Sequence, residues 1–280
     1  MPNWSINYLI SDLLGGGATL KPEPRQEIWA SDLGKPLFDT YHKMRGTPYT
    51  NPTDGRGMIT FLLGKAIEQG VYNMLKDVGL AFESQDKIRI ELEGCLPVTG
   101  RPDLVIQVTD WSQVVVNIDR LNKRDYRLDG LKEIVYRYAE QYPEGLQKMP
   151  FEIKSINSMA LRYNKAKGMA QAYPYHHLQL YTYMKAMGIS EGHLLYIAKD
   201  TGFMEEVVVN ATPELDARWV NEVKRISRAV SEVTEPSPEP LMIDNKKNWQ
   251  VEYSPYKEMI YQKQIASDVQ SEELPTVIIN

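Results

Sequence analysis

The sequence predicts an α/β fold with a central mixed β-sheet flanked by helices. Residues 104–108 form an apolar run, which is typical of a buried strand. Residues 87–93 alternate charged and apolar side chains, as a half-buried antiparallel strand does. Apolar residues at helical spacing between residues 58 and 78 predict a long helix. With 280 residues, the chain can bury a substantial core as one large domain or two small ones.

The first 30 residues are expected to form a separate N-terminal segment. Residues 4–14 have the pattern of a short amphipathic helix, and the glycines at 15–17 would end it in a flexible hinge. Ser31 and Asp32 follow, and they can cap a helix that extends to Met44. This helix would open the main domain.

The main domain is expected to cover residues 31–233. Its later elements follow in chain order: a strand at Glu152, a short helix that Ser158 caps, a helix that begins at Pro174, a hairpin formed by 194–198 and 205–209, and a helix from 213 to 233. Strands thus alternate with helices over most of this domain, which favours the α/β class.

Residues 234–280 differ in character from the main domain. Residues 235–240 contain three prolines, which favour an extended linker.

Two of the predicted strands place charged side chains where a metal site could form. Asp103 directly precedes the apolar run at 104–108, and Glu152-Ile153-Lys154 is itself strand-like. Because alternate residues of a strand share a face, Glu152 and Lys154 project together while Ile153 points into the core. Two carboxylates from neighbouring strands are hard oxygen ligands of the kind that Mg²⁺ or Mn²⁺ prefers. A lysine beside them can hold the attacking water or neutralise charge on a phosphate.

The charge distribution favours a local, rather than general, nucleic-acid surface. A net charge of −5 argues against a protein that coats nucleic acid, because phosphate binding needs positive charge. The stretch 153–190, however, has no Asp or Glu. Such a stretch could hold a strand by its phosphates and bases, although the tyrosines could equally pack a helix against the sheet. Its basic residues are Lys154, Arg162, Lys165, Lys167 and Lys185, and its tyrosines include Tyr163, Tyr173, Tyr175, Tyr181 and Tyr183.

The order of these motifs resembles the PD-(D/E)xK nuclease superfamily, and specifically its RecB-like exonuclease branch. The resemblance covers residues 31–199. It rests on Pro102-Asp103, on Glu152-x-Lys154, on a later helix with Gln179-x-x-x-Tyr183, and on an upstream helix in which Gly64 precedes Glu68 by four residues.

The resemblance implies a restriction-endonuclease-like core and a role for each matched residue. The implied metal ligands are Glu68, Asp103, Glu152 and the backbone carbonyl of Ile153, with Lys154 catalytic. Gln179 would support the attacking water or a phosphate, Tyr183 would contact the DNA backbone, and His176 or His177 would bind the scissile phosphate. From the residues alone, either histidine could equally be a surface residue, and a mid-helix Glu68 could simply be solvated.

The chain departs from the branch in two places. Residues 111–149 form an insertion where related nucleases often have a short hairpin, and a helix is expected at 125–142. Its charges nearly balance, so it could be a lid over the substrate or a surface decoration. Residues 249–256 are similar to the C-terminal staple of iron–sulfur RecB-like nucleases. This likeness implies that the tail folds back on the core through Trp249, Tyr253 and Tyr256. An iron–sulfur cluster needs four thiolates, and Cys95 is the single cysteine, so no such cluster is expected.

The resemblance implies Mg²⁺- or Mn²⁺-dependent hydrolysis of DNA phosphodiesters, with exonuclease favoured over endonuclease. DNA repair, recombination or phage replication would be its setting, with single- or double-stranded DNA as partner and recombination or replication proteins as further candidates. The alternatives are a catalytically inactive DNA-binding or partner-docking module with a nuclease fold, and an unrelated α/β protein. Clustered carboxylates speak against a binding module, because they repel phosphate without a metal.

The sequence predicts an intracellular, cytoplasmic protein. No apolar stretch is long enough to span a bilayer, and the N-terminus lacks a basic region followed by an apolar core. The single Cys95 excludes an intramolecular disulfide framework and fits a reducing interior. The oligomeric state is left open.

Overall fold

The computed structural model describes residues 22–81, 87–123 and 128–272. The helix and hinge expected at 4–14 and 15–17 lie outside the described residues.

The chain divides into two compact units. Among the described residues, the first unit combines 22–28, 35–60 and 223–272, and the second combines 29–34 and 61–222. This division differs from the boundaries expected after residues 30 and 233. The C-terminal region groups with an early segment of the chain because the two share a hydrophobic core.

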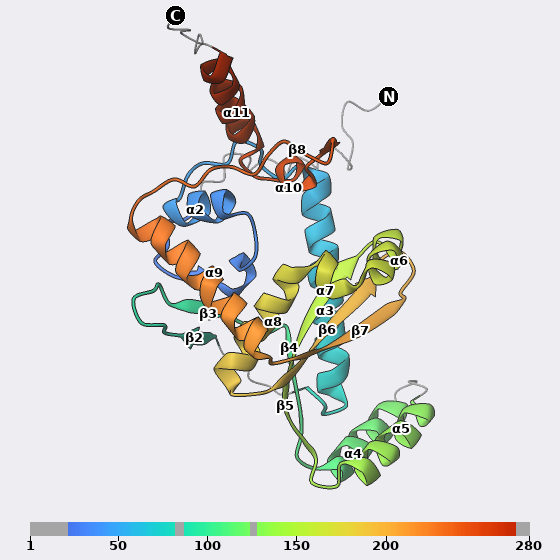
Figure 1. Ribbon diagram of the computed structural model, residues 1–280. Helices are drawn as coiled ribbons and strands as arrows, with labels where there is room; N and C mark the ends of the chain where they lie inside the picture. Colours follow the sequence, from blue (N-terminus) through green and yellow to red (C-terminus); the bar gives the residue numbers. More distant parts are fainter. Residues whose placement is uncertain (1–21, 82–86, 124–127, 273–280) are drawn as a thin grey trace, which may run out of the picture. The chain divides into compact units, whose positions relative to one another are not determined.

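The second unit contains a four-stranded mixed β-sheet (Figure 1). The strands β4 (Leu104–Val108), β5 (Leu146–Ile156), β6 (Glu191–Ala198) and β7 (Met204–Asn210) lie in the order β4-β5-β6-β7. β5 and β6 run parallel, whereas the other two pairs are antiparallel. The predicted α/β class with a mixed sheet is confirmed, as are the buried strand at 104–108 and the β6–β7 hairpin.

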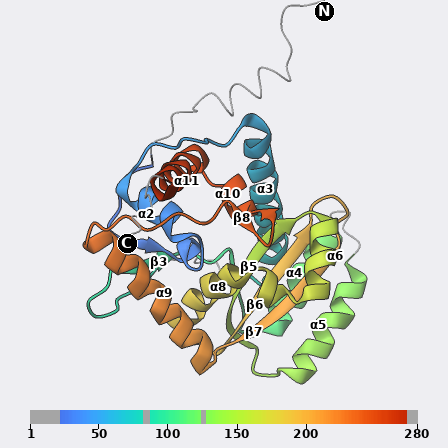
Figure 2. The same ribbon diagram turned by 45° about the horizontal axis from the view of Figure 1, so that its top comes forward.

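Helices pack on both faces of this sheet. On one face, Leu104 and Ile153 form a core with Ile67 and Val71 of α3 (Gly55–Asp77). The other face is covered by α8 (Pro174–Met187), which Figure 2 shows beside β5 and β6. The packing of α8 is close: a Cβ added at Gly192 of β6 would lie 3.1 Å from Leu180 Cδ1. Glycine at this position therefore lets the helix approach the strand.

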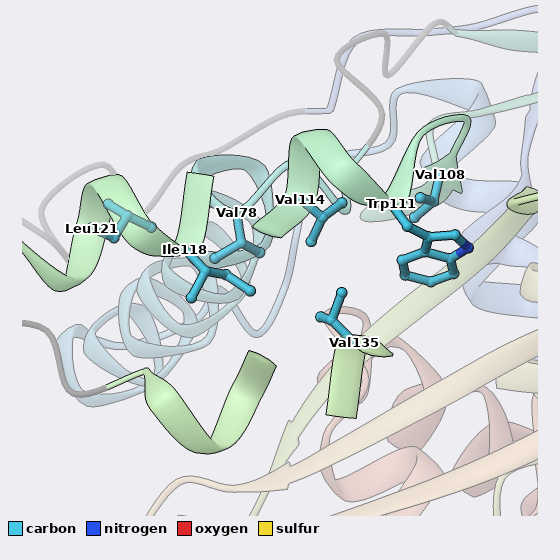
Figure 3. Close-up of a cluster of buried hydrophobic side chains, with 7 residues drawn as sticks. All are labelled: Val78, Val108, Trp111, Val114, Ile118, Leu121 and Val135. Atoms are coloured by element: carbon cyan, nitrogen blue, oxygen red, sulfur yellow. The ribbon is translucent and has the colours of Figure 1, made fainter. Parts of the chain in front are cut away.

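Two helices with their own core separate β4 from β5. They are α4 (Trp111–Asn122), whose N-terminus is capped by Asp110, and α5 (Asp129–Gln141). The sequence predicted the second but not the first. The core residues, labelled in Figure 3, are Val78, Val108, Trp111, Val114, Ile118, Leu121 and Val135.

The remaining helices of the second unit include α6 (Ser158–Lys167), α7 (Met169–Ala172) and α9 (Pro213–Ser231), whose C-terminal part enters the first unit. Ser158 was expected to cap α6 but is its first residue. Asn157 caps it instead, because its side chain accepts a hydrogen bond from the Met159 N–H at 2.9 Å. Pro174 begins α8, as predicted.

The strand expected at 87–93 is shorter and belongs to another sheet. It is β2 (Ile88–Ile90), which pairs antiparallel with β3 (Val98–Gly100) in a three-stranded sheet completed by β1 (Ile28–Trp29). The helix expected after Ser31 and Asp32 is also different. These residues lie in the 3₁₀ helix η1 (Ala30–Asp32), while α2 (Leu37–Arg45) begins after Pro36.

The first unit is built around α2 and the C-terminal region. The latter contains the short strands β8 (Met242–Ile243) and β9 (Lys246–Lys247) and the helices α10 (Trp249–Glu252) and α11 (Lys257–Glu272). Val251, Tyr256 and Ile260 bury against Phe38 of α2.

Of the three aromatic anchors expected in the tail, only Tyr256 is buried. Trp249 is 55% exposed and Tyr253 is 83% exposed, so the expectation was wrong for these two residues. Among the described residues, no helix is both long enough and apolar enough to cross a membrane.

Candidate active site

The pairing of β4 with β5 brings Asp103 beside Glu152. Leu104 pairs with Phe151, so the positions next to them, Asp103 and Glu152, also face each other. The backbone N–H of Ile153 donates a hydrogen bond to Asp103 Oδ2 at 2.8 Å. This bond fixes the Asp103 carboxylate against β5. The two carboxylates therefore share one side of the sheet, as a common metal ion would require.

Lys154 and Gln179 hold Glu152 from two directions. Lys154 Nζ donates to Glu152 Oε1 at 2.5 Å and to Gln179 Oε1 at 3.1 Å. Gln179, which projects from α8, donates from Nε2 to Glu152 Oε1 at 2.7 Å. The three side chains form a closed hydrogen-bonded triangle. One strand and one helix thus position a carboxylate, an ammonium and an amide together.

Glu68 reaches the same site from α3. Gly64 makes this possible, because a Cβ there would lie 3.0 Å from the Oγ of Ser155 on β5. One turn later, Glu68 is half-buried. Burial raises the pKa of Glu68, and the negative charge of Asp103 raises it further. The two carboxyl groups therefore lie close enough to repel each other.

Asp103 and Glu152 give the site more negative charge than Lys154 balances. Burial, followed by repulsion from Glu152, raises the pKa of Asp103 to about 8. Burial also raises the pKa of Glu152, and Glu68 acts in the same direction, while Lys154 opposes both. Glu152 is only 1% exposed. Its Oε2 atom is buried without a hydrogen-bond donor, unless a protonated Asp103 supplies one. A cation shared by these groups would relieve the repulsion and occupy that oxygen.

The carboxylate oxygens at the site are suitable ligands for a hard divalent metal, although their side chains do not surround a single metal position. Carboxylate oxygens are the ligands that Mg²⁺ and Mn²⁺ prefer. Within the part of the chain that the structure describes, however, no group of three or more His, Cys, Asp or Glu side chains already forms a metal cluster. Lys154 occupies one oxygen of Glu152 instead.

The two histidines, which the sequence left undistinguished, point to different surroundings. The Nδ1 atom of His176 lies 3.0 Å from the hydroxyl of Tyr196, which is the residue opposite Lys154 in the β5–β6 register. His177 instead lies beside the Tyr173 carbonyl, and burial together with the charge of Arg218 lowers its pKa. Only His176 is therefore linked to the strand positions that form the site.

Tyr183 lies beneath the site rather than on its surface. Its side chain is 2% exposed, and its hydroxyl accepts a hydrogen bond from Gln179 Nε2 at 3.2 Å. A Cβ at Gly100 would lie 2.9 Å from Tyr183 Cε1, so glycine at that position makes room for the ring. The burial disfavours the expected contact with the DNA backbone, and Tyr183 acts on Gln179 instead.

Acidic residues from other elements neutralise part of the positive charge of the stretch 153–190. Lys165 forms an ion pair with Glu205 at 2.6 Å, and Lys185 forms one with Asp216 at 2.6 Å. Lys167 lies over the ring of Tyr163, 4.4 Å from its centroid. Arg162 is exposed, and no hydrogen bond or ion pair joins it to other described residues. Of the three expected substrate-binding cations on α6, Arg162 is thus the one most open to an anion.

Sequence reasoning missed two contributors, Tyr196 and Ser155. Tyr196 is fully buried near Glu152, and burial raises its pKa, with neighbouring tyrosines and Glu152 adding to the shift. Neither residue belongs to a motif. Ser155 could have been found from Gly64, because a glycine in a helix interior often marks a close approach.

Comparison with known proteins supports the fold alone. No protein-family model matches this chain, and no curated protein matches it. Among solved structures, the chain is similar to the crystal structure of SSO0001, with a TM-score of 0.50 and 16% sequence identity over 90% of this chain and 93% of that chain. At this identity the likeness bears on the α/β architecture and not on activity.

Proposed function

We propose that this protein is a Mg²⁺- or Mn²⁺-dependent deoxyribonuclease, with exonuclease as the favoured mode. The observation that supports it most is the placement of Asp103 and Glu152 side by side where β4 pairs with β5, next to Lys154. Glu68 of α3 is near enough for its charge to act on Glu152. A structural role does not require three carboxylates that raise one another's pKa.

Glu68, Asp103 and Glu152, with the backbone carbonyl of Ile153, would hold the metal. When bound, the metal would supply positive charge that lowers the pKa of the attacking water and stabilises the phosphate during its transfer. The attacking water would add to phosphorus and release one proton to solvent. The phosphorus–oxygen bond to the leaving sugar oxygen would break, and that oxygen would take up a proton from solvent.

Two side chains, Lys154 and Gln179, would stabilise and orient the reacting groups. The Lys154 ammonium lies at the carboxylates, where it can stabilise the additional negative charge of a pentavalent phosphate. Gln179 orients both Lys154 and Glu152, and its amide can turn toward the attacking water or a phosphate oxygen. Tyr183 and His176 then act by positioning: the first contacts Gln179, and the second contacts Tyr196.

We further propose that the protein acts inside the cell, in DNA repair, recombination or phage replication. Its single cysteine fits a reducing compartment. Recombination or replication proteins are the proposed protein partners.

The test is digestion of end-labelled single- and double-stranded DNA with Mn²⁺, repeated with EDTA. Wild-type protein should cut only with the metal, and Lys154→Ala should reduce the rate by roughly 10²-fold or more. Lys123→Ala, which removes an exposed lysine at the end of α4, should leave the rate unchanged.

End-blocked and circular substrates separate the two modes, because an exonuclease requires a free end. Tight DNA binding without cutting under any divalent metal would instead support the inactive binding module.

A further inference from the structure

A cavity lies between α6 and the turn that joins β6 to β7. Figure 1 shows α6 at the end of the sheet where β6 stops and β7 begins. The cavity has a volume of about 360 Å³, which falls within the usual range of about 300–1,000 Å³ for ligand sites. It is lined by Ser158, Leu161, Arg162, Lys165, Thr201 and Phe203.

The wall combines an aromatic surface with one available cation. Leu161 is buried, and the Phe203 side chain is 55% exposed, so its ring is accessible. Lys165 is already paired with Glu205, whereas Arg162 has no hydrogen-bond or ion-pair partner among the described residues. A flat, apolar group with an attached anion would match this wall. A nucleobase with its phosphate has that chemistry, because every base offers a face for stacking.

The cavity is held open by hydrogen bonds within the chain. Asp200 accepts from the Ser158 backbone N–H at 2.9 Å and from the Ser158 hydroxyl at 2.6 Å. These bonds tie the start of α6 to the turn after β6. A wall fixed in advance loses less conformational freedom when a ligand binds.

The candidate active site and the start of α6 lie a short distance apart along β5. Lys154 lies three residues before Asn157, the cap of α6. At the rise of an extended strand this separation is roughly 10 Å. A stacked nucleic-acid strand advances about 3.4 Å per nucleotide, so roughly three nucleotides would cover the same distance.

We propose that this cavity binds one unstacked base of the strand that is cut at the Asp103–Glu152 site, with the base on Phe203 and a neighbouring phosphate on Arg162. The inference rests on the proposed function. Beyond that function, it assigns a subsite for one base at a fixed number of nucleotides from the cut bond.

The first experiment follows the cutting of single strands that each contain one abasic residue. With Mn²⁺, the wild-type rate should fall about 10-fold at the bond that lies a fixed number of nucleotides from the abasic residue. Phe203→Ala should remove this dependence on position and should cut intact DNA with a higher KM and a similar kcat. Val208→Ala, which truncates an exposed apolar residue of β7, should behave as wild type.

The second experiment measures binding of a short labelled single strand in EDTA, where no cutting occurs. Phe203→Ala and Arg162→Ala should each weaken affinity about 10-fold. Val208→Ala and Arg137→Ala, the latter removing an exposed arginine of α5, should leave affinity unchanged.

The outcomes separate the two proposals. The subsite proposal is overturned if the cutting rate does not fall at one fixed distance from the abasic residue. It is also overturned if Phe203→Ala shows the same fall as the wild type. Neither result contradicts the proposed nuclease activity. An absence of cutting overturns the nuclease. In that case the subsite depends on the binding experiment, and equal affinity of Phe203→Ala and Val208→Ala overturns it as well.

Discussion

Two aspartates, Asp39 in the first unit and Asp103 in the second, have different strongest neighbours. Burial raises the pKa of Asp39 on α2 and the pKa of Asp103 before β4. Asp39 accepts a hydrogen bond from the Ser254 hydroxyl at 2.6 Å, and the positive charge of Lys43 favours its ionised form. Asp103 faces Glu152, whose negative charge raises its pKa further.

The charged neighbours of the two carboxyl groups show which one indicates a functional site. Both carboxyl groups have a hydrogen-bond donor and a nearby lysine, but the strongest neighbouring charge is Lys43 at Asp39 and Glu152 at Asp103. A carboxyl packed against others is left with repulsion that a cation relieves. Raised pKa values alone would not separate the two sites, but the sign of the strongest neighbouring charge does.

The largest expected difference between the two sites is in activity. Asp103→Asn should reduce the Mn²⁺-dependent cutting rate by roughly 10²–10³-fold, because it removes a charged ligand and leaves the fold intact. Ser254→Ala, at the structural site, should leave the rate per folded molecule unchanged. Initial rates on labelled DNA check both. Equal losses in the two variants would mean that the sites do not differ as proposed.

Metal binding should stabilise the protein only through the Asp103 site. With Mn²⁺ at 100 times its Kd, the free energy of unfolding should rise by about 2.7 kcal/mol in the wild type. The rise should vanish in Asp103→Asn. Ser254→Ala should lower the free energy of unfolding by about 1–3 kcal/mol, because it leaves the buried Asp39 without its donor, yet it should retain the response to Mn²⁺. Urea unfolding with Mn²⁺ or EDTA measures each value.

The metal-free protein should have a pH dependence to which Asp103 contributes. The pKa of this group rises from 3.8 to about 8 on folding, so between these pH values the folded state retains a proton that the unfolded chain has lost. Its contribution to stability is therefore complete at low pH and is lost as the pH rises toward 8. Asp103→Asn should show a smaller fall in the free energy of unfolding between pH 5 and pH 8 in EDTA. Identical slopes for wild type and variant would contradict the assignment.

The smallest expected effect concerns the approach of α3 to β5. Gly64→Ala would place a Cβ 3.0 Å from Ser155 Oγ. We expect α3 to shift slightly from β5 and to change the position of Glu68, which should weaken Mn²⁺ affinity several-fold, as supporting positions near a metal do.

Gly70→Ala is the matched control, because nothing lies within 4 Å of its added Cβ. It should stabilise α3 by about 0.5–1 kcal/mol without changing affinity. Titration calorimetry with Mn²⁺ distinguishes the two, and Ser155→Ala combined with Gly64→Ala should restore binding if the contact is the cause.

Much of the fold followed from local patterns. The apolar run at 104–108, the helix around 58–78 and the start of α8 at Pro174 are present, because buried strands, amphipathic helices and proline geometry are set by neighbours in sequence. Helix caps were less predictable. Ser31 and Ser158 resemble caps, but Pro36 precedes α2 and Asn157 caps α6, since competing residues stand close by.

In the candidate site, too, local pattern predicted some features and tertiary packing decided others. Alternation along β5 sufficed to put Glu152 and Lys154 on one face. The choice between His176 and His177, and the burial of Tyr183, depended on α8 packing against β6, which no motif records. The acid-free stretch likewise gained Glu205 and Asp216 as partners from distant elements.

By itself, the sequence determined the α/β class, the mixed sheet and the order of acidic and basic side chains on β5, because strand and helix periodicity depend on adjacent residues. The tertiary structure alone decided that Glu68 and Asp103 approach Glu152, that the C-terminal region packs on α2, and which cations stay unpaired. Each of these depends on residues far apart in the chain, whose contacts are set by strand register and helix packing rather than by local pattern.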